Sequence, residues 1–66
     1  MSADIVVRRE GLSLVMVEPQ TDEAKSWLES VTDGTWFGGA LVVEPRYLLP
    51  LVQGAVDEGF EVRRQS

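Results

Sequence analysis

The sequence predicts an α+β fold of the two-layer sandwich type, in which a mixed four-stranded sheet carries two helices on one face. Segments rich in β-branched and apolar residues alternate with two segments whose apolar residues recur at helical spacing, in the order ββαβαβ. The chain has 66 residues and no internal repeat or linker, which indicates a single domain. We expect this domain to span residues 1–66, with an ordered core over about residues 4–63 because chain ends commonly fray.

Two strands are predicted at the start of the chain, over residues 5–9 and 12–17, because both segments are dominated by β-branched and apolar residues. Glu10 and Gly11 separate them. A short link that ends in glycine suits a tight hairpin, since glycine tolerates the positive φ that such turns require. The two strands are therefore expected to be antiparallel neighbours.

A first helix is predicted over residues 22–31. Thr21 is a suitable N-cap, and Asp22 and Glu23 place negative charge in the first turn, where it meets the positive end of the helix dipole. The apolar residues of this segment fall at positions i, i+3, i+4 and i+7 and form one buried stripe, made of Ala24, Trp27, Leu28 and Val31.

A third strand is predicted over residues 36–44. It contains Gly38 and Gly39 near its start, where we expect the pair to permit a β-bulge or the close approach of a helix. A phosphate-binding loop is disfavoured because such loops run from a strand into a helix, whereas these glycines lie between a helix and a strand.

A second helix is expected to begin near Tyr47, because Pro50 is tolerated only within a first helical turn. Gly59 suits the end of this helix, and residues 60–63 form the last strand. The buried stripe of the helix is expected to contain Leu48, Val52, Ala55 and Val56.

Alternation along the central strands assigns side chains to the two faces of the sheet. The helix-bearing face is expected to receive Leu12, Leu14, Met16, Ala40 and Val42. The opposite set would then stand on the helix-free face, where an exposed apolar cluster marks an interaction site unless long arginine side chains fold across it. This candidate apolar interface consists of Val15, Val17, Leu41 and Val43.

The composition excludes several kinds of function. The chain has no His and no Cys, which rules out disulfides and the common zinc sites and leaves its serines without the usual catalytic base. We therefore expect no enzyme activity, no metal and no cofactor. A net charge of −5 disfavours direct binding to nucleic acid or anionic lipid. The absence of an apolar run of about 20 residues, and of a signal-peptide pattern, predicts a cytoplasmic protein outside the membrane.

Charged residues suggest two further features. Asp57 and Glu58 oppose the dipole at the end of the second helix, so either a nearby arginine compensates them or they form an acidic recognition spot. The acidic partner surface is expected to consist of Asp22, Glu23, Glu29, Asp57 and Glu58. Strand arginines are expected to act mainly as edge charges that discourage aggregation, and these are Arg8, Arg9, Arg63 and Arg64.

The run W-F-G-G-A-L-V-V-E-P-R-Y over residues 36–47, with D-E-G-F-E-V over residues 57–62, resembles a pattern in short uncharacterised bacterial and phage proteins. The resemblance covers residues 10–62 and implies a mobile-element context, but no activity and no site residue. Our leading hypothesis is a non-enzymatic module that binds a basic protein surface, such as a phage-borne inhibitor or modulator of a host protein machine. The alternative is a structural homodimer that pairs through the helix-free sheet face or a strand edge.

Overall fold

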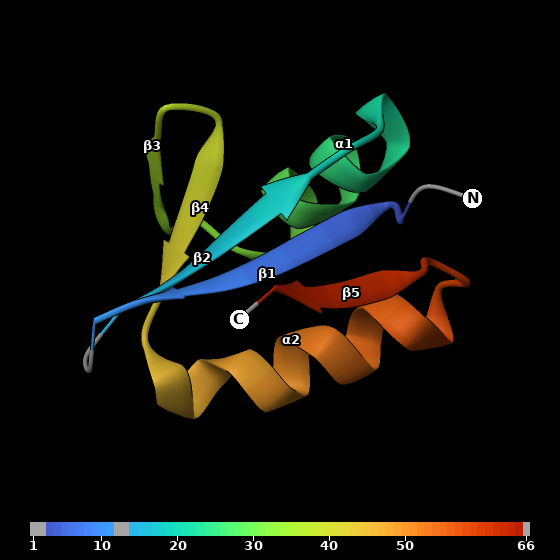
Figure 1. The fold of residues 1–66 in the computed structure, drawn as a ribbon. Helices are drawn as coiled ribbons and strands as arrows, with labels where there is room; N and C mark the ends of the chain where they lie inside the picture. Colours follow the sequence, from blue (N-terminus) through green and yellow to red (C-terminus); the bar gives the residue numbers. More distant parts are fainter. Residues whose placement is uncertain (1–2, 12–13, 66) are drawn as a thin grey trace.

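The computed structural model describes residues 3–11 and 14–65. Over these residues the elements follow one another as ββαββαβ (Figure 1), so the predicted α+β class is confirmed, whereas the sheet has five strands in place of four. The elements are β1 (Ile5–Glu10), β2 (Leu14–Pro19), α1 (Asp22–Val31), β3 (Thr35–Phe37), β4 (Ala40–Val43), α2 (Pro45–Asp57) and β5 (Val62–Gln65).

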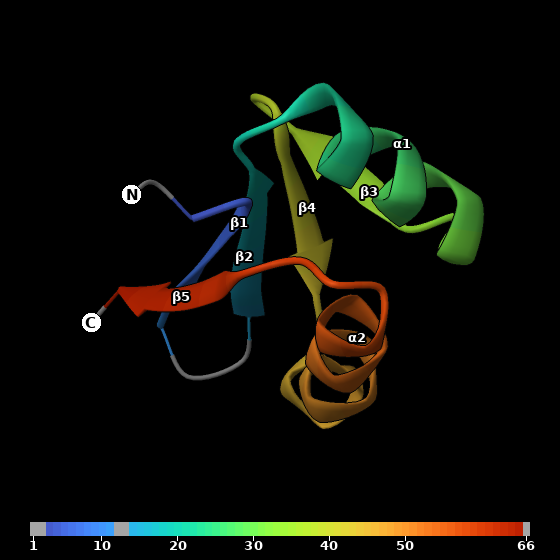
Figure 2. The same ribbon diagram turned by 90° about the vertical axis from the view of Figure 1, so that its right-hand side faces the viewer.

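The sheet is mixed, with the strand order β3-β4-β2-β1-β5. The pairs β1–β2, β2–β4 and β3–β4 are antiparallel, and β5 joins the sheet parallel to β1. Figure 2 shows that α1 and α2 lie on the same side of the sheet. β3 and β5 are consequently the two edges of the sheet.

The additional strand arises from the glycine pair between β3 and β4. Gly38 has a φ of 57° and Gly39 a φ of 82°, and two consecutive positive φ values are what a type I′ hairpin turn requires. The predicted single strand over residues 36–44 is therefore wrong: the chain reverses at the glycines, and Phe37 pairs with Ala40 across the turn.

The core lies between the sheet and the two helices, and it contains the four residues that alternation assigned to the helix-free face. That assignment is wrong. Val15 and Leu41 have no exposed surface, Val17 is 2% exposed and Val43 is 9% exposed. The antiparallel register places Val15 opposite Val43 and Val17 opposite Leu41. All four pack in one cluster with buried residues of β1, α1 and α2, namely Ile5, Val7, Ala24, Leu28 and Ala55.

The residues expected on the helix-bearing face take the other side of the sheet. Leu14 is 45% exposed, and Met16 and Val42 are only half-buried. Ala40 is buried but stands outside the core cluster, and Leu12 lies outside the described residues. Both sets of alternating residues are apolar, so alternation separated two faces without identifying the inner one.

The first helix forms where it was predicted. The Thr21 side chain accepts a hydrogen bond from the backbone N–H of Ala24 at 3.1 Å, as an N-cap does. Ala24 and Leu28 are fully buried, and Trp27 packs against the core. Val31 departs from the predicted stripe, because it is 50% exposed at the end of the helix.

The second helix begins two residues earlier than predicted, with Pro45 at its first position. Proline suits that position because its missing N–H would have no helical partner there. Pro50 consequently lies inside the helix, where it leaves the Arg46 carbonyl without the usual i+4 donor. Of the predicted buried stripe, Ala55 is 1% exposed, whereas Val56 is 57% exposed.

The last strand closes the sheet beside the first one. The backbone N–H groups of Asp4 and Ile5 donate to the Glu61 carbonyl, and the Glu61 N–H donates to the Asp4 carboxylate at 2.9 Å. Phe60 and Val62 pack against the core, as predicted. The centroids of the Phe60 and Trp27 rings are 5.7 Å apart. The first and last strands of the chain thus lie side by side (Figure 1).

Candidate functional site

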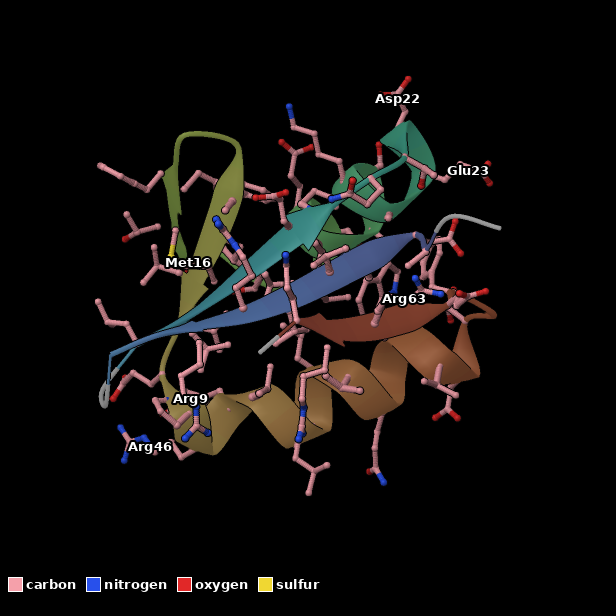
Figure 3. All side chains as sticks on the ribbon, in the orientation of Figure 1. Arg9, Met16, Asp22, Glu23, Arg46 and Arg63 are labelled. Atoms are coloured by element: carbon pink, nitrogen blue, oxygen red, sulfur yellow. The ribbon has the colours of Figure 1, made fainter. Side chains whose placement is uncertain are left out.

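The five acidic residues of the predicted partner surface are all exposed. Asp22 and Glu23 open α1 and project away from the sheet in Figure 3. Asp57 is the last residue of α2 and Glu58 caps it. In Figure 1 the start of α1 and the end of α2 lie at the same end of the molecule. We call Asp22, Glu23, Asp57 and Glu58 the acidic end; Glu29 lies further along α1.

No ion pair in the described part of the chain involves these acidic residues. The three that form join Arg8 to Glu18 at 3.2 Å, Arg46 to Glu44 at 3.7 Å and Arg63 to Glu61 at 3.8 Å. Among the described side chains, no arginine therefore forms an ion pair with Asp57 or Glu58. Their charge opposes the helix dipole without local compensation.

A second surface occupies the helix-free side of β2, β3 and β4. Phe37 is 73% exposed and Leu14 is 45% exposed. Together with three neighbours these residues line a shallow hollow of about 530 Å³, and Figure 3 shows Met16 at this part of the sheet. We call it the helix-free patch: Leu14, Met16, Thr35, Phe37 and Val42. It takes the place of the predicted apolar interface, whose four residues are in the core.

A third surface runs between α2 and the edge of the sheet formed by β1 and β5. Two adjoining hollows of about 300 and 590 Å³ share Val7, Leu48 and Arg64 as lining residues. We call it the α2–β5 groove. Its apolar walls are Val7, Leu48, Leu49, Val52, Val56 and Val62, and Arg9 and Arg64 line it as well.

The strand arginines are divided between the two faces of the sheet. Arg64 pairs in register with Val7 on β1, and it lines the α2–β5 groove together with Arg9. Arg8 is on the helix-free side, where its Nη2 atom contacts Glu18 and its buried Nε atom finds no partner among the described groups. Only Arg63 and Arg64 lie on an edge strand. Because β1 pairs with β2 on one side and β5 on the other, the prediction of edge charges is wrong for Arg8 and Arg9.

Among the described residues, no cluster of three or more acidic, histidine or cysteine side chains is arranged to hold a metal ion. None of the described helices is long and apolar enough to cross a membrane. The surfaces that stand out are therefore the acidic end, the helix-free patch and the α2–β5 groove.

Comparisons with protein-family models, curated proteins and solved structures found no match to this chain.

Sequence reasoning missed the helix-free patch and the α2–β5 groove. A signal for the groove was present, because Leu49 recurs at helical spacing with Val52 and Val56, although those two residues were assigned to the buried stripe. The patch required the position of the Gly38-Gly39 turn. Once that turn is placed, Phe37 stands at the end of an edge strand and not within a longer central one.

Proposed function

We propose that this chain is a non-enzymatic protein-binding module whose acidic end contacts a basic surface of its partner. A phage or other mobile element is the context suggested by the sequence resemblance, with inhibition or modulation of a host protein machine as the role. The observation that supports the proposal is the set of four exposed carboxylates, free of ion pairs to described residues, at one end of the fold.

The charges of Asp57 and Glu58 are unfavourable for folding where they stand. Carboxylates near the C-terminus of a helix cost a few tenths of a kcal/mol or more, and the described residues provide no arginine against them. We infer that these charges serve a function outside the fold. Complementary charge across an interface accelerates association and disfavours incorrect partners.

The test is partner capture with charge-matched variants. The quadruple variant Asp22→Asn, Glu23→Gln, Asp57→Asn, Glu58→Gln removes the acidic end. The control variant Glu10→Gln, Glu29→Gln, Asp33→Asn, Glu44→Gln changes the net charge equally at positions outside the acidic end. We expect the wild type and the control to retain one stoichiometric partner from host lysate, and the quadruple variant to lose it. Failure of the wild type to retain any partner, or equal loss in both variants, contradicts the proposal.

The helix-free patch supports a second candidate, a homodimer formed by two sheets packed face to face. The supporting observation is the 73% exposure of Phe37 beside Leu14, Met16 and Val42, since exposed apolar clusters commonly mark interfaces. Sedimentation equilibrium over micromolar to millimolar concentrations tests it. We expect Phe37→Asp to abolish the dimer. Leu49→Asp, which changes an exposed apolar residue of α2, is expected to leave the dimer intact. A wild-type monomer throughout eliminates this candidate.

A further inference from the structure

We propose that the α2–β5 groove receives an extended segment of another protein, which pairs with the free edge of β5 and sets a carboxylate against Arg9 and Arg64. The inference concerns a different surface and a different partner chemistry from the acidic end. It can therefore hold or fail independently of the proposed function.

The first observation is that β5 is a sheet edge. Among the described residues it pairs only with β1, so one row of its backbone N–H and C=O groups has no strand beside it. Such an edge is a template for another strand unless it is covered or otherwise protected. Addition of a peptide strand at an edge supplies affinity through main-chain hydrogen bonds.

The second observation is a second apolar stripe on α2. Leu51 and Ala55 face the core, and Val52 both packs against the core and lines the groove. Leu49 and Val56 line the groove outside the core. Leu49 is 68% exposed and Val56 is 57% exposed, so these two side chains are not buried by the fold. Because alternate side chains of a strand point to one face, a segment beside β5 directs every second side chain toward this stripe.

The third observation is the charge within the groove. Arg9 and Arg64 line the larger of its two hollows, both are exposed, and neither forms an ion pair with a described carboxylate. Guanidinium groups bind carboxylates through paired, charge-assisted hydrogen bonds. Two arginines beside an apolar wall therefore favour a segment with alternating apolar residues that carries an acidic side chain or ends in its C-terminal carboxylate.

A second copy of the chain fits this edge less well. β5 begins Val62-Arg63-Arg64 and ends with Gln65, so two β5 strands paired antiparallel around their centres bring Arg63 of one copy opposite Arg64 of the other. Like charges directly opposite one another destabilise a strand pair. Nucleic acid is disfavoured by the net charge of −5.

The probe is a fluorescein-labelled pool of hexapeptides. Each has Val, Ile or Leu at alternate positions, Ser or Thr between them, and Asp or Glu at the end with a free carboxylate. The control pool has the same apolar pattern but ends in lysine amide. We expect saturable, salt-sensitive binding of the acidic pool by fluorescence anisotropy and weaker binding of the control pool. Absence of saturable binding up to millimolar protein overturns the proposal.

The variants distinguish binding in the groove from non-specific electrostatic attraction. Arg64→Glu is expected to weaken binding at least about tenfold. Arg63→Glu, the same charge change on the next residue of β5, is expected to leave binding within about twofold because Arg63 lies on the opposite face of the strand. Val56→Asp replaces an exposed apolar side chain of the groove wall with a charged one. Circular dichroism verifies that each variant folds. Equal weakening by Arg64→Glu and Arg63→Glu overturns the proposal.

The final measurement is hydrogen exchange at the free edge of β5. Bound peptide is expected to slow hydrogen exchange at the amides of β5 that do not donate to β1, while amides of β3 at the other edge exchange as before. Sedimentation run in parallel reports self-association. Protection of β5 that rises with protein concentration in the absence of peptide identifies a second copy as the occupant and overturns the peptide proposal.

Discussion

Leu41 and Leu14 are leucines on the two faces of the sheet with opposite environments. Leu41 is completely buried, whereas Leu14 is 45% exposed. We predict that Leu41→Ala lowers the free energy of unfolding by about 2–5 kcal/mol, because it removes buried methyl groups and leaves a cavity. Leu14→Ala is expected to cost less than about 1 kcal/mol. Urea denaturation measures both, and equal losses contradict the assignment of the faces.

The inner face could not be identified from residue type alone. Residues 14–17 read Leu-Val-Met-Val and residues 40–43 read Ala-Leu-Val-Val. Each alternating set is therefore apolar, and either set is suited to the core. The choice depends on which set meets the helices, and that is a property of the assembled layers. Periodicity predicted strands here correctly, but it could not reveal which side α1 and α2 cover.

At the scale of elements, local signals predicted α1 well. Thr21, the acidic first turn and the apolar spacing all act within residues 21–31, and the helix has the predicted bounds. The Gly38-Gly39 turn was missed because apolar residues precede and follow the pair, so the run resembles one strand. The start of α2 was missed because Pro45 was read as closing a strand, whereas it is also suited to opening a helix.

The β3–β4 turn offers a test of this interpretation. Gly39→Ala is predicted to destabilise the fold by about 1–2 kcal/mol, because an alanine at positive φ meets steric resistance that glycine avoids. Gly38→Asn is the control, since asparagine is well tolerated in the first position of a type I′ turn. Thermal unfolding with circular dichroism compares them. A Gly39→Ala variant as stable as the wild type argues against this backbone conformation.

The two helices meet where Trp27 of α1 lies over Gly54 of α2. A Cβ atom at residue 54 would stand 3.3 Å from Cζ2 of Trp27, and Trp27 in turn packs near Phe60. Gly54→Val is predicted to cost about 1–3 kcal/mol because the larger side chain displaces the indole. Gln53→Val changes the adjacent exposed position and is expected to cost less than about 1 kcal/mol. Urea denaturation and the tryptophan emission maximum report the difference.

At the scale of the whole molecule, carboxylates at the start of α1 and at the end of α2 have opposite effects on stability. We predict that Asp57→Asn and Glu58→Gln each raise the free energy of unfolding by a few tenths of a kcal/mol, because they remove negative charge from the negative end of a helix dipole. Glu23→Gln, in the first turn of α1, is expected to lower it by a similar amount. Low-salt urea denaturation measures all three, and changes of the same sign would contradict the dipole argument.

Prediction of the candidate surfaces requires the assembled fold more than prediction of the individual helices and strands does. The exposure of the five acidic residues follows from their helical positions, and it was predicted. The separation of Arg9 and Arg64 from Arg8 and Arg63 requires β5 to pair parallel to β1 in one register. No short-range signal carries that register, because the two strands are distant in sequence, and so the α2–β5 groove emerged only from the assembled fold.

The parallel pair of β1 and β5 also implies an order of folding events. Asp4 and Glu61 are hydrogen-bonded across 57 positions of the chain, whereas β1 and β2 meet across a short connection. Closing a long loop costs more entropy than closing a short one, so we expect β5 to dock after the rate-limiting step. Asp4→Ala should then speed unfolding and leave refolding nearly unchanged in stopped-flow experiments; slower refolding by a matching factor would place β5 in the nucleus. The α2–β5 groove would accordingly be completed by the last strand to dock, and a peptide that bridges it would lengthen the lifetime of the native state.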